Sequence, residues 1–210
     1  QELIPVFILP ARLFSALLMI AVLALTGCQT AGKGRRGRTF VSPPGGLYFS
    51  VILRPHAKPE ALMHLTAMVA VAAARAVFAV SGVYPDIKWT NDLVLGGKKL
   101  CGILTEIGIE AESREVDYAV VGIGINVCVP QSMVPEALRE SAVSIDDVAE
   151  KPTDRVALLA KVLDHLETCY ETVLKEGFGP ILDEWRRYSV TLGRMVKVIA
   201  PDTTYTGKAE

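Results

Sequence analysis

The feature that most restricts the fold of this chain is a long apolar stretch, residues 59–81, which reads PEALMHLTAMVAVAAARAVFAVS. Pro59 and Glu60 suit the first turn of a helix, and Gly82 suits its end. A helix that is apolar on nearly every side has to be buried on nearly every side. The helix is therefore predicted to be buried on most sides.

Segments rich in β-forming residues lie on both sides of the predicted helix. One strand is predicted before it, at 46–55, and others after it, at 86–90, 92–96, 99–109 and 116–127. The pair Gly96-Gly97 is a hairpin signal between two of these strands.

Helical periodicity returns in the last third of the chain. Residues 153–177 predict a helix with Thr153 as N-cap and Gly177 at its end, and 178–190 predict a shorter helix. Residues 194–210 predict a strand, a turn and a strand. This order predicts an α+β domain, a mixed or antiparallel sheet with helices packed on it, followed by the start of a small β module.

Composition narrows the class of function. A length of 210 residues suggests one domain, or one domain with a small appendage. The net charge of −1 argues against a protein that works on nucleic acid. The four cysteines lie far apart with no C-x-x-C pair, which argues against a zinc site or a redox motif. Cys101 and Cys128 fall in apolar runs and are predicted to be small core residues.

The N-terminal segment, residues 1–28, is atypical. It is apolar from 13 to 27 and ends in LTGC, which resembles the lipobox of bacterial lipoproteins with Cys28 as the lipid-bearing residue. The apolar part is shorter than the roughly 20 residues of a spanning helix and matches a signal-peptide core better. A buried helix or strand, and a foreign or misread start, are the other interpretations.

A glycine-rich basic loop follows this segment, and its glycines spell G-x-G-x-x-G. A dinucleotide-binding turn would open a helix, but this loop runs into TFVSPPGG, which cannot begin one. No acidic residue between Glu2 and Glu60 could hold a ribose. The phosphate-binding pattern G-x-x-x-x-G-K-[ST] is also absent.

A mobile lid that covers an anion fits the loop better, because glycines permit close approach and guanidinium groups bind phosphate or carboxylate. A solvated run of surface charge is the alternative. The loop consists of Gly32, Lys33, Gly34, Arg35, Arg36, Gly37 and Arg38.

Five motifs, taken together and in order, resemble the catalytic domain of the biotin–protein ligases, the biotin–[acetyl-CoA-carboxylase] ligases. They are GKGRRGR (32–38), SPPGGLYFS (42–50), KWTND (88–92), GGKKLCGILTE (96–106) and GIGINV (122–127). The resemblance implies a class II synthetase-like catalytic domain over 29–190. It also implies the beginning of an SH3-like C-terminal domain, cut short, over 191–210.

The resemblance implies a two-step reaction that uses ATP and Mg²⁺. Biotin is activated as biotinyl-5′-AMP and then transferred to a lysine of a biotin carboxyl carrier protein of acetyl-CoA carboxylase. A cytoplasmic enzyme is expected, without DNA binding because no helix-turn-helix is recognised, and a homodimer is left open. The alternatives are a lipoate–protein ligase-like enzyme, against which GKGRRGR and KWTND argue, and a membrane-tethered lipoprotein that retains the fold for binding only.

The resemblance also implies roles for individual residues. Lys88 matches an essential lysine that contacts the biotin carboxylate and the α-phosphate, and Arg35 is the catalytic residue of the loop. Asp92 is implied at a magnesium ion. The other residues implied at biotin or the adenylate are Gln29 beside the biotin ring, Phe40 near the adenine, and Gly32, Lys33, Gly34, Arg38, Asn91, Lys99 and Asn126.

The chain departs from the family pattern at three places. Lys33 replaces an arginine and Thr90 replaces a proline. A Ser-Thr-Asn segment that binds the ureido head of biotin is not recognised in residues 1–28, which predicts weakened biotin binding.

Overall fold

The computed structural model describes residues 6–8, 22–24, 32–54, 62–112, 116–199 and 203–210. A five-stranded sheet with the strand order β3-β7-β6-β5-β4 forms its centre. Every neighbouring pair in this sheet is antiparallel, so the antiparallel alternative is correct. The strands are β3 (Gly46–Leu53), β4 (Asp86–Lys88), β5 (Asp92–Leu95), β6 (Lys98–Ile109) and β7 (Val116–Asn126).

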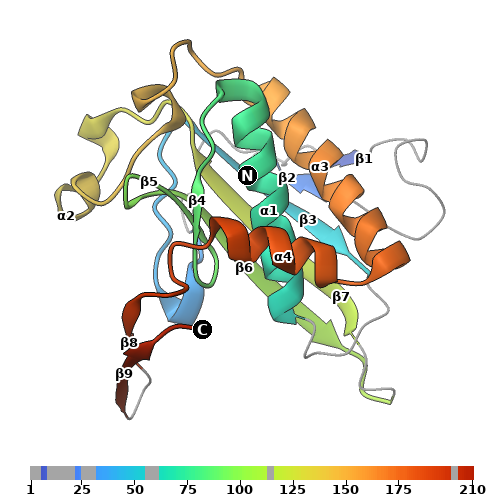
Figure 1. The fold of residues 1–210 in the computed structure, drawn as a ribbon. Coiled ribbons are helices and arrows are strands. Elements are labelled where there is room, and N and C mark those ends of the chain that lie inside the picture. Colours follow the sequence, from blue (N-terminus) through green and yellow to red (C-terminus); the bar gives the residue numbers. More distant parts are fainter. Residues whose placement is uncertain (1–5, 9–21, 25–31, 55–61, 113–115, 200–202) are drawn as a thin grey trace.

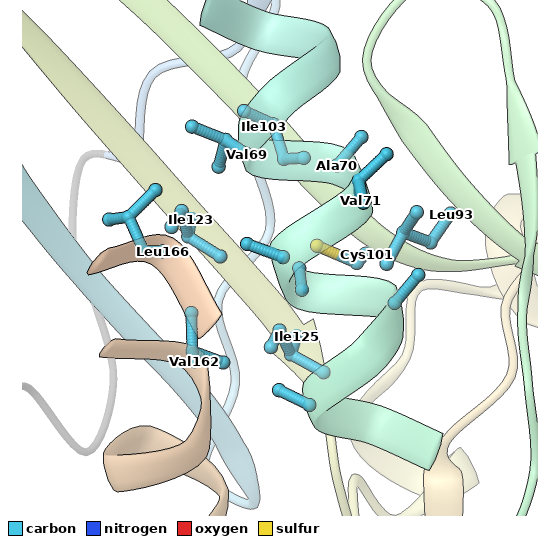
Figure 2. Close-up of a cluster of buried hydrophobic side chains, with 14 of the residues drawn as sticks. Val69, Ala70, Val71, Leu93, Cys101, Ile103, Ile123, Ile125, Val162 and Leu166 are labelled. Carbon is cyan, nitrogen blue, oxygen red and sulfur yellow. The ribbon is translucent and has the colours of Figure 1, made fainter. Parts of the chain in front are cut away.

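Helix α1 (Leu62–Ser81) is the predicted apolar helix, and it lies between the sheet and the helices α3 (Arg155–Glu176) and α4 (Gly179–Tyr188) (Figure 1). Its residues 68–74 are fully buried. Figure 2 shows Val69, Ala70 and Val71 of α1 among side chains from the sheet and from α3. Although α1 is long and apolar enough to cross a membrane, most of it is buried in this core.

The ends of the helices follow local chemistry. The N-cap of α3 is Asp154 and not the predicted Thr153, because the Asp154 carboxylate accepts the backbone N–H groups of Val156 and Ala157. Gly177 ends α3 with a positive φ of 74°, as expected. Between β7 and α3 the chain forms short helical turns that the sequence did not predict: η3 (Gln131–Met133), α2 (Glu136–Arg139) and η4 (Ile145–Asp147).

The two predicted core cysteines differ. Cys101 is buried on β6, and burial raises the pKa of its thiol to about 12. The prediction for Cys128 was wrong. This residue lies beyond the end of β7, and it is exposed with its thiol 3.5 Å from the carbonyl oxygen of Gly45.

Two small hairpins flank the domain in sequence. Strands β1 (Val6–Ile8) and β2 (Val22–Ala24) pair antiparallel, and β2 contacts β3, so the apolar segment 13–27 does contain a strand. Cys28 and the rest of residues 1–28 lie outside the described residues. Strands β8 (Met195–Ile199) and β9 (Thr204–Lys208) form the predicted C-terminal hairpin.

Candidate active site

Three glycines, Gly102, Gly122 and Gly124, leave a strip without side chains on the face of the central sheet that points away from α1. This strip is called the glycine strip. Cys101 and Ile103 face the helix in Figure 2, so Gly102 and Leu104 face the other way. Gly102 is paired with Gly124, and Leu104 is paired with Gly122. The strip forms the floor of a cavity of about 280 Å³, called cavity 1.

Phe40 lies on this strip because the strip has no side chains. A Cβ atom on Gly124 would approach the Phe40 ring to 2.6 Å, and one on Gly102 would approach it to 2.9 Å. The ring meets Tyr48 edge-on, with centroids 6.2 Å apart, and Lys99 Nζ lies 5.9 Å from its centroid. A phenylalanine in this place therefore requires glycine at both positions of the strip.

Two further cavities adjoin the first. Cavity 2, of about 260 Å³, has an apolar wall supplied by Val129, Val134 and Leu138 from the segment after β7. Cavity 3, of about 750 Å³, lies between the basic loop, the turn between β4 and β5, and strand β8. Lys99 and Phe40 line all three cavities, so the three spaces meet at these two side chains.

Backbone and side-chain contacts hold Lys99 in place. Its backbone N–H donates to Ser141 at 2.7 Å, and its carbonyl accepts the N–H of Val143 at 3.0 Å. Its ammonium nitrogen lies 2.7 Å from Asp92 Oδ1. Asn126 Nδ2 donates to the carbonyls of Lys99 and Val143, at 3.4 and 3.2 Å. Asn126 thus ties the segment after β7 to β6, and within the described part of the chain its side-chain oxygen remains for a ligand.

The basic loop folds back on itself. Gly34 N–H donates to the carbonyl of Arg38 at 2.7 Å, and Phe40 N–H donates to that of Gly32 at 2.8 Å. The backbones of Lys33 and Thr39 form an isolated antiparallel β-bridge. The turn η1 (Arg35–Gly37) lies at its tip.

The loop's arginine reaches the KWTND turn. Arg35 Nη1 donates to Thr90 Oγ1 and, at 3.2 Å, to Asn91 Oδ1. Arg35 lines both cavity 1 and cavity 3 as a result.

The structure brings together most of the residues proposed from sequence. Around cavity 1 lie Gly32, Lys33, Gly34, Arg35, Phe40, Asn91 and Lys99. Arg38 lines cavities 2 and 3, and Asn126 lines cavity 2. Lys88, at the exposed end of β4, and Asp92 line cavity 3 but neither of the other two. Gln29 lies outside the described residues.

Sequence reasoning did not single out several residues of the site. Ser50 and Glu106 line cavity 1, and Arg194 and Lys197 of the C-terminal hairpin line cavity 3. Ser50 and Glu106 lie in the motifs SPPGGLYFS and GGKKLCGILTE, but the sequence of a strand does not show which cavity its residues line. The glycine strip was visible as G-x-G in GIGINV, yet glycines carry no reactive group that would mark them.

Asp92 fits a magnesium site of the kind that substrate phosphates complete. Its Oδ1 is buried, and its contact among the described residues is the ion pair with Lys99 Nζ at 2.7 Å. Among the described residues no group of three or more His, Cys, Asp or Glu side chains could hold a metal alone. Mg²⁺ commonly takes one or two carboxylates and completes its shell with phosphate oxygens and water, which one aspartate beside cavity 3 allows.

Similarity to known proteins agrees with this geometry. Residues 11–126 match the biotin/lipoate A/B protein ligase family. The chain is 36% identical to the bifunctional ligase/repressor BirA of Bacillus subtilis over 86% of this chain and 55% of that protein. It is 32% identical to the biotin–[acetyl-CoA-carboxylase] ligase of Paracoccus denitrificans, over 87% of this chain and 74% of that one.

A solved structure resembles the whole fold. The biotin protein ligase from Aquifex aeolicus in complex with biotin and ATP superposes with a TM-score of 0.79 at 29% identity, over 94% of this chain and 80% of that one. The chain spans about half the length of the first curated relatives that it matches. By sequence and by fold, the chain belongs to the biotin/lipoate A/B protein ligase family.

Proposed function

We propose that this chain carries the catalytic site of a biotin–[acetyl-CoA-carboxylase] ligase, which joins biotin to ATP and passes the biotinyl group to a protein lysine. The observation that carries the proposal is the meeting of three cavities at Lys99 and Phe40. Biotin, the adenine of ATP and its polyphosphate can each occupy one cavity. The carboxylate of biotin and the α-phosphate, which react, then meet at one cation.

Cavity 1 suits biotin. Lys99, Lys33 and Arg35 supply positive charge at the cavity for a carboxylate, and the glycine strip leaves room for an apolar chain. Ser50 and Glu106 supply hydrogen-bond acceptors for the N–H groups of a ureido ring. Glu106 lies four residues along β6 from Gly102, about 14 Å at 3.4 Å per residue, so the cavity suits a long ligand with unlike ends.

Cavities 2 and 3 suit ATP. The apolar wall of cavity 2 faces Phe40, which suits the flat adenine, and Asn126 supplies a polar group at its edge. Cavity 3 carries six basic side chains and the carboxylate of Asp92, which suits a polyphosphate with a metal ion. The basic side chains are Arg35, Arg38, Lys88, Lys99, Arg194 and Lys197.

In the first step a biotin carboxylate oxygen attacks the α-phosphorus, the bond from that phosphorus to the bridging oxygen breaks, and pyrophosphate leaves. Two anions must approach each other, so cations fixed at that point lower the barrier. Lys99 occupies the junction of the cavities, and Lys88 lines cavity 3, the proposed place of the phosphates. Mg²⁺ held by Asp92 would neutralise phosphate charge when bound.

In the second step a lysine amine of a biotin carboxyl carrier protein attacks the carbonyl carbon of the mixed anhydride. AMP leaves, an amide forms, and the amine loses a proton. We place the enzyme in the cytoplasm, where ATP and the carrier protein are found. The net charge of −1 gives no basic excess for DNA binding, and a homodimer stays a prediction that light scattering can test.

The test is the formation of biotinyl-5′-AMP and pyrophosphate from biotin and ATP by the purified chain, followed by transfer to an apo-carrier protein. Lipoate offered in place of biotin distinguishes the lipoate ligase alternative. Binding of biotin without pyrophosphate release would favour a protein that keeps the fold for binding only. No turnover and no binding of either acid would overturn the proposal.

A further inference from the structure

Thr90 stands where the family motif has proline, and it makes a contact that proline cannot make. Its hydroxyl accepts a hydrogen bond from Arg35 Nη1, and the same hydroxyl donates to Asn91 Oδ1 at 3.2 Å. A proline at this position has no hydroxyl and no side-chain acceptor. The loop and the KWTND turn are therefore joined in this chain by a group that the family motif lacks.

The contact continues into the rigid part of the sheet. Asn91 Nδ2 donates to the carbonyl of Ile103 at 2.8 Å, and the backbone N–H of Ile103 donates to the carbonyl of Asn91 at 2.9 Å. Ile103 is buried in the core on β6. A chain of hydrogen bonds thus runs from the core strand through Asn91 and Thr90 to the tip of the basic loop.

Arg35 makes the hydrogen bonds that attach the tip of the loop to the KWTND turn. The hydrogen bonds of Gly34 and Arg38 stay within the loop, whereas Arg35 Nη1 bonds to Thr90 and Asn91, 55 and 56 positions away. Among the side chains and backbone groups that the structure describes, no other hydrogen bond joins Gly34, Arg35 or Arg38 to the sheet or to the turn between β4 and β5. The position of the tip over cavities 1 and 3 depends on these two acceptors.

The contacts leave the guanidinium able to bind an anion. Arginine has five N–H donors, and the described contacts use those of Nη1, so the donors of Nη2 and Nε remain. Because the guanidinium is planar, fixing one nitrogen fixes the plane in which the others lie. An arginine that is already oriented loses less conformational entropy when the ligand arrives.

We infer that Thr90 is a positioning residue, whose hydroxyl orients Arg35 over the site and holds the tip of the basic loop against the KWTND turn. Thr90 acts through Arg35 and touches no reacting atom. The ligand that Arg35 would hold is the phosphate of biotinyl-5′-AMP, and that part rests on the proposed function.

The first test needs no ligand. Trypsin cleaves after lysine and arginine, and the loop contains four such residues, so nicking at 33–38 reports how often the tip detaches. Thr90→Val keeps the shape and removes the hydroxyl, and it is expected to raise the nicking rate about fivefold. Thr90→Ser keeps the hydroxyl and should restore the parent rate. Thr168→Val, on the exposed face of α3, is the matched control.

The second test measures the dissociation of synthetic biotinyl-5′-AMP, which requires no catalysis. Thr90→Val should release it about fivefold faster, and Thr90→Ser at the parent rate. In an Arg35→Lys background the same Thr90→Val change should have no further effect, because its route runs through the guanidinium. A chain that binds no biotinyl-5′-AMP would overturn the proposed function, while the nicking result would still decide the role of Thr90. Equal nicking of the Thr90→Val variant and the parent would overturn the inference.

Discussion

Lys99 Nζ lies 2.7 Å from Asp92 Oδ1, and this ion pair joins neighbouring strands at the point where the three cavities meet. Asp92 is paired in register with Gly102, over which the Lys99 ammonium lies; a Cβ on Gly102 would be 3.2 Å from it. The resemblance implies that Lys88 is the essential lysine. Lys88 lines cavity 3 but neither cavity 1 nor cavity 2. The two lysines can be separated by experiment.

Lys99→Met is expected to lower the rate of pyrophosphate release by about 10²–10³, because it removes a fixed cation at the point of attack. Lys88→Met should chiefly raise KM for ATP, since Lys88 stands beside the polyphosphate cavity. Lys98→Met, next to Lys99 but on none of the cavities, is the matched control. A loss in kcat for Lys88→Met as large as that for Lys99→Met would give Lys88 the central role that the resemblance implies.

Asp92→Asn is expected to shift the magnesium dependence of adenylation to concentrations about tenfold higher or more, because an amide is a weaker ligand for Mg²⁺ than a carboxylate. The rate of pyrophosphate release measured against Mg²⁺ concentration checks this. Asp86→Asn, on the same hairpin and exposed, is the control. An unchanged magnesium dependence would place the metal elsewhere.

Much of the fold could be predicted because its signals are local or periodic. The apolar stretch that ends at Gly82 was predicted as a buried helix and forms α1, and Gly96-Gly97 joins β5 to β6 as expected. The N-cap of α3 was misplaced by one residue because both Thr153 and Asp154 can cap. The segment 129–142 has no periodicity, and contacts with distant residues such as Lys99 hold it in place.

The site could be predicted as a set of residues but not as an arrangement. Motif order placed Lys88 and Lys99 near the same ligand, yet the direction of each side chain depends on the pairing register of β4, β5 and β6. The contact between Arg35 and Thr90 joins positions 55 residues apart, and no local pattern carries such information.

The basic loop is expected to become more protected when biotin and ATP are added together. Four cations lie within seven residues and repel one another until an anion neutralises them. Nicking by trypsin at 32–38 should therefore slow by about tenfold. Arg35→Gly should release the adenylate early and biotinylate nearby lysines indiscriminately. Nicking that is indifferent to biotin plus ATP would show that the loop does not close on the adenylate.

Acid should weaken the fold through an ion pair between α1 and α4, two helices that line none of the three cavities. Glu184 accepts a bidentate contact from Arg75, and Tyr84 also donates to it, at 3.3 Å. The hydrogen bond from Arg75 lowers the pKa of Glu184 below its ordinary value of 4.5, despite the opposing effect of burial. The stability from this pair is present above pH 4.5 and is lost as the pH falls through the lowered pKa.

Glu184→Gln is therefore expected to lower the free energy of unfolding by about 1–3 kcal/mol at pH 7 and by progressively less toward acid pH. Urea unfolding at several pH values measures this. Glu150→Gln, an exposed loop residue, should leave the pH profile unchanged. A Glu184→Gln variant with the parent's acid sensitivity would show that other carboxylates control it.

Two glycines of the strip should separate ligand binding from folding. A Cβ on Gly122 meets nothing closer than 3.7 Å, so Gly122→Ala should fold normally while its methyl group enters cavity 1. Biotin affinity, measured by calorimetric titration, is expected to fall about tenfold or more, as for other overpacked sites.

A Cβ on Gly124 would lie 2.6 Å from Phe40. Gly124→Ala should therefore displace that ring, weaken both biotin and ATP, and cost about 1–3 kcal/mol of stability. Gly207→Ala, in β9 with no atom within 4 Å, controls for the change itself. Full biotin affinity in Gly122→Ala would mean that biotin does not lie over the strip.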